Sequence, residues 1–180
     1  MRENCAKPEN GRGPSVKPMR EANFSELLPL LVWHQVKFIV IGGGAAIAHG
    51  LARLTYDIDV VYARDKDNID TLIQALEKHH PYLRGVPPGL PFQWDRPTIT
   101  AGLNFTLTTD LGDLDLLGEV TGGGHYEDLL SFSEELEVFG ARCRFVTLER
   151  LIQLKRASGR PKDLEVIAEL QALLEERRRG

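Results

Sequence analysis

The sequence predicts an α+β fold, with a mixed β-sheet flanked by helices and two further helices at the C-terminal end. Apolar residues recur at helical spacing in some segments and alternate with polar residues in others, so both kinds of element are present. Helices and strands alternate in the first half of the chain, and strands joined by short turns follow. We therefore expect one domain over residues 21–180, with terminal helices at about 147–178, after a flexible arm over residues 1–20.

The composition is that of an ordinary globular protein. Of the 180 residues, 42% are hydrophobic and 27% charged, and the net charge of −4 gives no overall basic surface for nucleic acid. Cys5 and Cys143 form neither a disulfide framework nor a metal-ligand pair. No apolar run is long enough to span a bilayer, and the N-terminus lacks the apolar core of a signal peptide. We therefore expect a cytoplasmic protein without a membrane partner.

The N-terminal arm has a local excess of positive charge. Its five basic residues outnumber its two acidic residues, and its sequence has neither a helical nor a strand period. A basic arm can contact RNA, but charged arms of this kind are more often solvated tails. The solvated tail is the favoured interpretation.

In the first half of the domain, helix and strand signals alternate. A helix can begin at Asn23 or Ser25, because both residue types are good N-caps and an apolar stripe at helical spacing follows. The elements expected after it are a strand at about 37–41, a glycine turn with a short helix to about residue 50, a strand at 57–62, and a helix capped by Asp67 or Asn68 that runs to about residue 80.

The middle of the domain begins with an irregular segment. Residues 81–97 hold five of the ten prolines, which predicts an ordered loop without regular structure. From Ile99 onward the pattern is that of a strand. Its period of two predicts that Leu103, Phe105 and Leu107 face the core.

Two hairpins are expected next. Residues 110–113 have the composition of a turn, so Asp110 and Asp113 are interpreted as turn formers and residues 114–120 as the returning strand. A short helix is expected near residues 126–130. A second hairpin over about 136–146 turns at Gly140.

Two helices complete the domain. Thr147 can cap a helix that ends at Gly159, since glycine readily adopts the left-handed conformation of a C-terminal cap. Pro161 fits the first turn of the next helix, where its missing N–H costs nothing. The buried stripe predicted for this last helix consists of Leu164, Ile167, Ala168, Leu170 and Leu174.

Two acidic residues interrupt an otherwise apolar strand. Asp57 and Asp59 are two positions apart, so both side chains leave the same face, with Cα atoms roughly 6.5 Å apart. Such like charges repel, and a divalent cation between them would remove the repulsion. The alternative is an exposed edge strand with two solvated acids. Asp115, in another apolar strand, can complete an all-oxygen site suited to Mg²⁺ or Mn²⁺ if the two strands are neighbours.

Three consecutive glycines, Gly42, Gly43 and Gly44, separate the first strand from the next helix. Glycines let backbone N–H groups approach phosphate oxygens at a helix N-terminus, but a strand-to-helix turn also needs glycine for steric reasons alone. The stretch matches neither the G-x-x-x-x-G-K-S/T loop nor the G-x-G-x-x-G spacing. By itself the glycine turn is weak evidence for a phosphate site.

Together these motifs resemble the nucleotidyltransferase fold of the DNA polymerase β superfamily, in which Gly-Gly precedes Asp-x-Asp and a third Asp follows on a later strand. The finer pattern is similar to the branch that contains AbiEii-type toxins and minimal nucleotidyltransferases. The resemblance runs from about residue 24 to residue 174. The matching residues are Gly42-Gly43, His49-Gly50, Arg53, Thr55, Asp57-Ile58-Asp59, Asp115-Leu116-Leu117 and the segment from Lys155 to Asp163.

The resemblance implies a role for each acidic residue. Asp57 and Asp59 would hold two divalent metal ions, and Asp115 would hold one of them and act as base toward an acceptor hydroxyl. Gly42 and Gly43 would cradle the triphosphate of an NTP such as ATP. Two metal ions about 3.5–4 Å apart stabilise both the attacking and the leaving oxygen of an in-line displacement. The implied reaction is transfer of a nucleoside monophosphate, with pyrophosphate as the leaving group.

Four further residues are candidates for nucleotide binding. Arg53 can reach a phosphate or face solvent, and Thr55 can orient the acidic loop by hydrogen bonding. Lys155 and Arg160 are candidates for phosphate contacts. A cation in the last turn of a helix also interacts favourably with the helix dipole, so a structural role for Lys155 stays open. Asp163 is interpreted as a residue that favours the start of the last helix.

Two residues that often carry function are interpreted as structural. His49 is expected to support the core or a turn. Trp94 is expected to pack under the proline-rich loop rather than to stack on a base. No Ser/His/Asp or Cys/His arrangement is recognisable in the sequence.

The predicted function is a Mg²⁺-dependent nucleotidyltransferase that moves an NMP from an NTP to a hydroxyl of RNA, such as a tRNA end, of a protein or of a small molecule. One version is a toxin partnered by an antitoxin. The small size of the chain also suggests a second subunit that completes the site. The alternatives are an inactive nucleotide-binding module of the same fold and a metal-dependent phosphoesterase.

Overall fold

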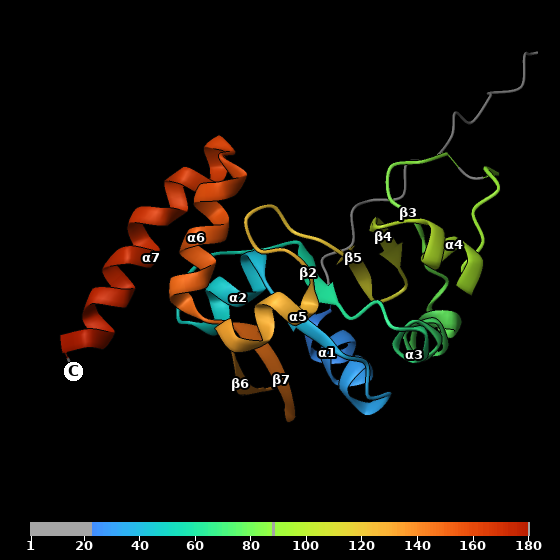
Figure 1. The fold of residues 1–180 in the computed structure, drawn as a ribbon, viewed down its shortest axis with the longest axis horizontal. Coiled ribbons are helices and arrows are strands. Elements are labelled where there is room, and N and C mark those ends of the chain that lie inside the picture. Colours follow the sequence, from blue (N-terminus) through green and yellow to red (C-terminus); the bar gives the residue numbers. More distant parts are fainter. Residues whose placement is uncertain (1–22, 88, 180) are drawn as a thin grey trace, which may run out of the picture.

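The computed structural model describes residues 23–87 and 89–179, and its centre is a seven-stranded sheet with the strand order β3-β4-β5-β2-β1-β7-β6 (Figure 1). The predicted N-terminal arm, residues 1–20, lies outside the described residues. The sheet is mixed, as predicted, because β2 pairs with β5 and β1 with β7 in parallel, while the other pairs are antiparallel. The strands are β1 (Phe38–Val40), β2 (Asp57–Tyr62), β3 (Tyr82–Leu83), β4 (Asn104–Thr109), β5 (Gly112–Leu117), β6 (Ser133–Val138) and β7 (Ala141–Val146).

Helices lie around this sheet. In Figure 1, α6 and α7 lie side by side beyond one end of the sheet, and α3 and α4 lie at the other end. The helices are α1 (Phe24–Trp33), α2 (Gly42–Ala48), α3 (Lys66–Leu76), α4 (Arg96–Ala101), α5 (Tyr126–Leu129), α6 (Leu148–Ser158) and α7 (Pro161–Arg179), with 3₁₀ turns at Glu77–His79 and Leu130–Phe132. The α+β fold class predicted from the sequence is confirmed.

The core is built from the central strands and from α1. The apolar stripe of α1 is as predicted, since Leu27, Leu28 and Leu31 are each at most 1% exposed. They belong to one apolar cluster with Ile39 of β1 and Val61 of β2, which are fully buried. Each such side chain contributes about 1.5–3 kcal/mol on burial. Burial on both faces therefore holds the central strands in place and fixes the position of the polar residues at their ends.

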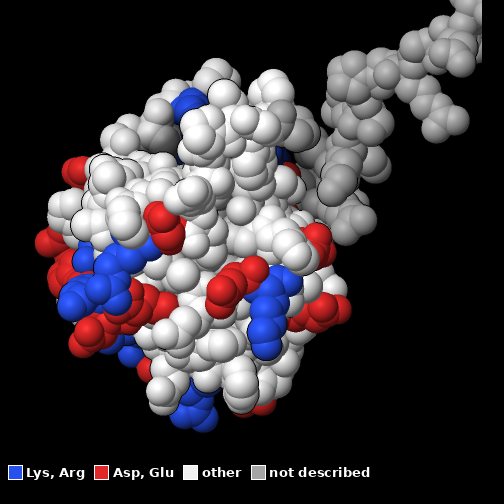
Figure 2. All heavy atoms as spheres, turned by 90° about the vertical axis from the view of Figure 1, so that its right-hand side faces the viewer, with Lys and Arg blue, Asp and Glu red and all other residues white. Residues whose placement is uncertain are grey.

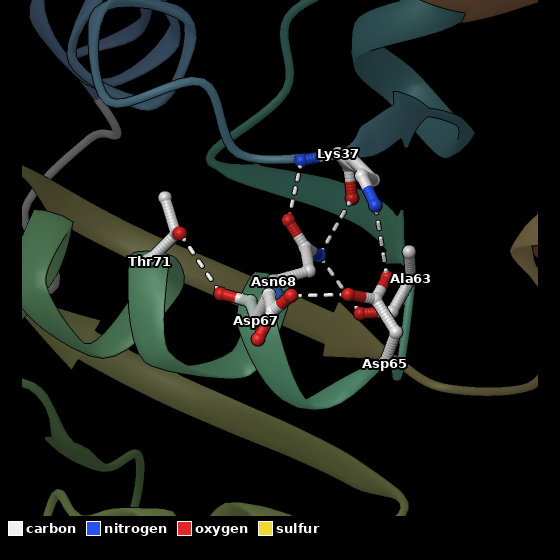
Figure 3. A network of polar contacts seen from close by, with 6 residues as sticks. All are labelled: Lys37, Ala63, Asp65, Asp67, Asn68 and Thr71. Atoms are coloured by element: carbon white, nitrogen blue, oxygen red, sulfur yellow. Dashed lines mark hydrogen bonds and ion pairs between the residues drawn. The ribbon is translucent and has the colours of Figure 1, made fainter.

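Helix α3 is capped by Asp65, and the prediction of Asp67 or Asn68 was wrong. The Oδ1 of Asp65 accepts a hydrogen bond from the backbone N–H of Asn68 at 3.0 Å. Figure 3 shows why Asn68 is not the cap: its buried side chain donates to the carbonyls of Lys37 and Ala63. Its Oδ1 also accepts from the N–H of Lys37 at 2.6 Å. Asn68 therefore ties the start of α3 to the chain that enters β1 and leaves β2.

The segment of residues 81–97 is more regular than predicted. It contains β3 and the start of α4, which Asp95 caps by accepting a hydrogen bond from a backbone N–H. Ile99, predicted to begin a strand, is a fully buried residue of α4, because Pro97 stands in the first helical turn, where proline favours a helix. Leu103, predicted to face the core, is 41% exposed because β4 begins only at the following residue.

The first hairpin also differs from the prediction. Strand β5 begins at Gly112, not at residue 114, and ends at Leu117, not at residue 120. Asp113 is therefore a strand residue with 4% exposure instead of a turn former. The second hairpin turns at Gly140 as predicted, where Phe139 and Gly140 both have positive φ and join β6 to β7 in a two-residue turn, but β6 begins at Ser133 and not near residue 136.

The caps predicted for the C-terminal helices are present. Thr147 accepts a hydrogen bond from the backbone at the start of α6, and Gly159, with φ of 63°, ends it. The stripe predicted for α7 was only partly right, because Leu164 is 54% exposed and Ala168 is also exposed. The residues of α7 that are buried are Asp163, Val166, Ile167 and Leu170.

Candidate functional site

The register of two parallel strands brings the acidic residues together. In the pairing of β2 with β5, Asp57 lies opposite Asp113 and Asp59 lies opposite Asp115. Alternate residues of a strand share a face, so the four side chains leave the same face of the sheet. Ligand oxygens of Asp57, Asp59 and Asp115 all lie within 4.8 Å of one another. The three acids named from the sequence therefore form one group.

The electrostatic environment of this group disfavours three free carboxylates. Burial, and then the charges of Asp57 and Asp115, raise the pKa of Asp59 to about 6. Burial also raises the pKa of Asp115, although the guanidinium of Arg84 acts in the opposite direction. A bound divalent cation would offset this repulsion, and three oxygen donors are the ligands that Mg²⁺ and Mn²⁺ prefer. The donor set thus fits a hard divalent ion.

Two of the three glycines make room for the site. Gly42 has φ of 61°, and a Cβ on it would lie 1.9 Å from Oδ2 of Asp59. A Cβ on Gly43 would lie 2.5 Å from Oγ1 of Thr55. The nearest atoms around Gly44 are instead carbons of Phe24 and other core side chains. Gly42 and Gly43 therefore belong to the site, and Gly44 belongs to the core.

A pocket of about 430 Å³ opens over the acids. The acidic group and the two glycines line it together with residues from the junction of α6 and α7. Carboxylates, basic side chains and apolar side chains thus line one cavity. The remaining lining residues include Lys155, Arg160, Lys162, Arg53, Arg84, Ala46, Ile47, Leu51 and Leu54.

Asp163 organises the basic side of the pocket. Its Oδ1 accepts from Nζ of Lys155 at 2.9 Å, and its Oδ2 accepts from Nε of Arg160 and from Oγ of Ser158, both at 2.6 Å. Burial acts to raise the pKa of Asp163, but these hydrogen bonds outweigh it and hold the pKa at about 2. Asp163 is thus a nearly buried carboxylate that positions two cations, which is more than the helix-start role predicted for it.

Thr55 and Arg53 lie at the side of the pocket. The Oγ1 of Thr55 donates to the backbone carbonyl or to Oδ1 of Asp57, each at 3.3 Å, and so orients that aspartate. Nη2 of Arg53 lies 2.5 Å from Oε1 of Glu169 on α7. Arg53 therefore lines the pocket and is at the same time part of an exposed ion pair.

Arg84 and Asp113 were missed by the sequence interpretation. Arg84 directly follows β3, in the segment predicted to be irregular, and Asp113 was assigned to a turn. The two side chains meet at 3.2 Å, and Arg84 also contacts Asp115 and Asp57. The sequence did contain a signal for Asp113. Asp113 and Asp115 are two positions apart, like Asp57 and Asp59, and this spacing places both side chains on one face of a strand.

The structural roles predicted for two aromatic residues are present. His49 is 2% exposed, with Nε2 at 2.7 Å from the carbonyl oxygen of Val146, so it supports the core. Trp94 packs against the core and donates from Nε1 to the carbonyl of Ile73. Neither side chain lines the pocket over the acids.

Figure 2 shows the face that carries α3 and α4. On the described residues drawn there, basic and acidic side chains lie beside each other between areas of uncharged surface. An ion pair of Arg96 with Asp70 joins α4 to α3. Among residues 23–87 and 89–179, no helix is long and apolar enough to cross a membrane.

Comparison with known proteins supports the fold. No family profile matches the chain, and no curated protein matches it in sequence. A solved structure from Thermotoga maritima, described as a putative nucleotidyltransferase, matches with a TM-score of 0.51 and 15% sequence identity, over 81% of this chain and 88% of that chain. The chain therefore has a nucleotidyltransferase-like fold. On that fold it carries an acidic group that can hold a metal ion.

Proposed function

We propose that this protein is a divalent-metal-dependent nucleotidyltransferase that transfers an NMP from an NTP to a hydroxyl group. The single observation that carries the proposal is the convergence of Asp57, Asp59 and Asp115 in the lining of the pocket. Their oxygens lie within 4.8 Å of one another, and the cations of the α6–α7 junction line the same cavity. Nucleotidyl transfer requires carboxylates that hold metal ions and cations that bind phosphates in one site.

The residues of the site fit Mg²⁺ or Mn²⁺. Asp57, Asp59 and Asp115 would hold the ions, which would neutralise the phosphates and polarise the reacting phosphorus. Gly42 supports this fit because the space its missing Cβ leaves is occupied by Oδ2 of Asp59. Without that space the carboxylate could not join the group.

The reaction assigns a task to each side of the pocket. The acceptor hydroxyl oxygen attacks the α-phosphorus, the bond from that phosphorus to the bridging oxygen breaks, and pyrophosphate leaves. Asp115 takes the proton of the hydroxyl. Lys155 and Arg160, positioned by Asp163, bind the β- and γ-phosphates and offset the charge that develops on the leaving group. Gly42 and Gly43 leave room for the triphosphate beside the acids.

The finer assignment rests on sequence motifs. The motifs around Asp57 and between Lys155 and Asp163 favour the branch of AbiEii-type toxins and minimal nucleotidyltransferases, with RNA, a protein or a small molecule as acceptor. A cytoplasmic location, where NTPs are available, and a neighbouring antitoxin or second subunit are part of this assignment. Expression of the gene with and without its genomic neighbour tests the toxin version, which predicts growth arrest only without the neighbour.

The proposal is tested first by calorimetric titration of each NTP in the presence of Mg²⁺. The wild type is compared with Asp57→Ala/Asp59→Ala and with Asp67→Ala, an exposed aspartate on α3 that serves as control. We expect metal-dependent NTP binding by the wild type and the control, and none by the double variant. Failure of the folded wild type to bind any NTP contradicts the proposal.

Labelled nucleotides identify the reaction. With an α-labelled NTP the label is expected on RNA, protein or a small molecule, whereas a γ-label is expected only in pyrophosphate. Transfer of the γ-label would indicate a kinase. Hydrolysis of phosphate esters without any NTP would indicate the phosphoesterase alternative, and NTP binding without transfer to any acceptor would indicate the inactive module.

A further inference from the structure

Arg84 contacts three aspartates of the site at once. Its Nη2 lies 2.6 Å from Oδ1 of Asp115, and its Nη1 lies 3.2 Å from Oδ2 of Asp113. Nη1 also lies 3.6 Å from Oδ2 of Asp57. Asp57 and Asp115 belong to the group that can hold a metal ion, and Asp113 does not. One guanidinium thus joins two metal-site carboxylates to a carboxylate beside them.

The sheet explains how Arg84 reaches these residues. Its backbone N–H donates to the carbonyl of Thr106 in β4 at 2.9 Å, so the chain still follows the edge of the sheet after β3 ends. Thr106 is the strand partner of Asp115. The long side chain of Arg84 crosses β4 to the carboxylates of β5 and β2, and it is 25% exposed in the pocket wall. Its planar fork of donors can serve several carboxylates.

The charges of the site require a compensating cation. Asp113 and Asp115 of β5 face Asp57 and Asp59 of β2, and the side chains of Asp113 and Asp115 are only 5% and 19% exposed. Carboxylates so close and so little hydrated are unfavourable unless they are paired. Arg84 provides that pairing in the metal-free protein. A divalent cation held by the same oxygens would repel the guanidinium.

We propose that Arg84 is an internal counter-ion of the acidic site, which stabilises the carboxylates before a divalent cation binds and moves onto Asp113 when the cation arrives. The inference rests on the proposed function, because it assumes a cation between Asp57 and Asp115. Asp113 has a defined part in it: its carboxylate remains available to hold Arg84 at the pocket wall. Arg84 then faces the space for the phosphates of the NTP.

The test measures metal binding without nucleotide. Mn²⁺ is titrated calorimetrically into the wild type, Arg84→Gln, Asp113→Asn and Arg84→Gln/Asp113→Asn, and the melting temperature of each protein is measured in EDTA. Arg96→Gln is the matched control, because Arg96 is also paired with an aspartate but does not line the pocket. The double variant differs from Asp113→Asn only in the loss of Arg84, so this comparison carries the test if Arg84→Gln alone does not fold.

We expect Arg84→Gln to melt at a lower temperature than the wild type in EDTA and to bind Mn²⁺ about tenfold more tightly, because the positive charge that contacts a metal-site carboxylate at 2.6 Å has been removed. The double variant is expected to regain part of the lost melting temperature and to bind Mn²⁺ more tightly than Asp113→Asn, which keeps Arg84. Arg96→Gln is expected to bind Mn²⁺ like the wild type.

Two results would overturn the inference in different ways. Unchanged or weaker Mn²⁺ binding by folded Arg84→Gln relative to the wild type, or by the double variant relative to Asp113→Asn, would show that Arg84 does not compete with the cation and would leave the proposed function untouched. Absence of Mn²⁺ binding by the wild type and by every variant would remove the metal site, and with it both the proposed function and this inference.

Discussion

Oδ2 of Asp59 occupies the space that a Cβ on Gly42 would need, since the two positions are 1.9 Å apart. The glycine turn and the acidic strand, 17 positions apart in sequence, are therefore parts of one site. Gly42 also has φ of 61°, a conformation that residues with a side chain rarely adopt. Two separate constraints thus require glycine at this position.

Replacement of Gly42 by alanine is expected to weaken Mn²⁺ binding by about 10–100-fold, because the added methyl group displaces Asp59 from the metal site. The free energy of unfolding should fall by about 1–3 kcal/mol. Calorimetry and urea unfolding measure the two effects. Gly85→Ala is the control, because Gly85 also has positive φ, 75°, but no atom lies within 4 Å of an added Cβ. Equal metal affinity in both variants would contradict the prediction.

Loss of the carboxylate of Asp163 is expected to destabilise the protein strongly. Lys155, whose side chain is 12% exposed, would lose the carboxylate that its Nζ contacts at 2.9 Å. Breaking a buried ion pair from one side costs about 3–5 kcal/mol, so Asp163→Ala should lower the free energy of unfolding by that amount. Urea unfolding provides the measurement. Glu165→Ala, an exposed change on the same helix, should stay within about 0.5 kcal/mol of the wild type.

The fold was predictable wherever one local signal decided the structure. Thr147, Gly159 and Pro161 define both ends of α6 and the start of α7 by local sequence signals alone, and the structure agrees. The pairing of Asp59 with Asp115 depends instead on which strands are neighbours, so the sequence could predict it only if β2 and β5 were assumed to be adjacent. Ile99 shows the limit of local signals, because an apolar residue two positions after a proline fits a strand or a short helix equally well.

The site was predictable in its acids but not in its counter-charges. Asp57, Asp59 and Asp115 stand out as charges in apolar strands. Arg84 lies in the proline-rich segment predicted to be irregular, and Asp163 lies among charged residues at the start of the last helix, so only the tertiary structure identifies them as partners of the site. Such ion pairs join residues that are distant in sequence or on different helices, and no local pattern signals them.

The stability of the metal-free protein is expected to rise as the pH falls from 7 to about 4.5. The pKa of Asp59 is about 6 in the folded protein and 3.8 in the reference state, so the folded protein takes up a proton first and is stabilised below the folded pKa. The gain should be about 1–3 kcal/mol. Urea unfolding in EDTA at several pH values measures it.

Asp59→Asn is the control for this pH dependence, because an amide does not titrate. Its stability should change less than that of the wild type over the same pH range, because only Asp115 of the group keeps a raised pKa, and at pH 7 it should exceed that of the metal-free wild type. An Asp59→Asn variant with the same pH profile as the wild type would show that another group is responsible.

Variants of the exposed ion pair between Arg53 and Glu169 can show whether Arg53 binds the nucleotide or has only a structural role. Both side chains are more than 40% exposed, and exposed pairs contribute little to stability, so Arg53→Ala and Glu169→Ala should unfold like the wild type. If Arg53 binds a phosphate of the NTP, Arg53→Ala should weaken NTP binding with Mg²⁺ about tenfold. Glu169→Ala should leave NTP binding unchanged or make it tighter, because it releases the guanidinium. Equal weakening by both variants would show that the ion pair shapes the pocket and that Arg53 does not itself contact the nucleotide.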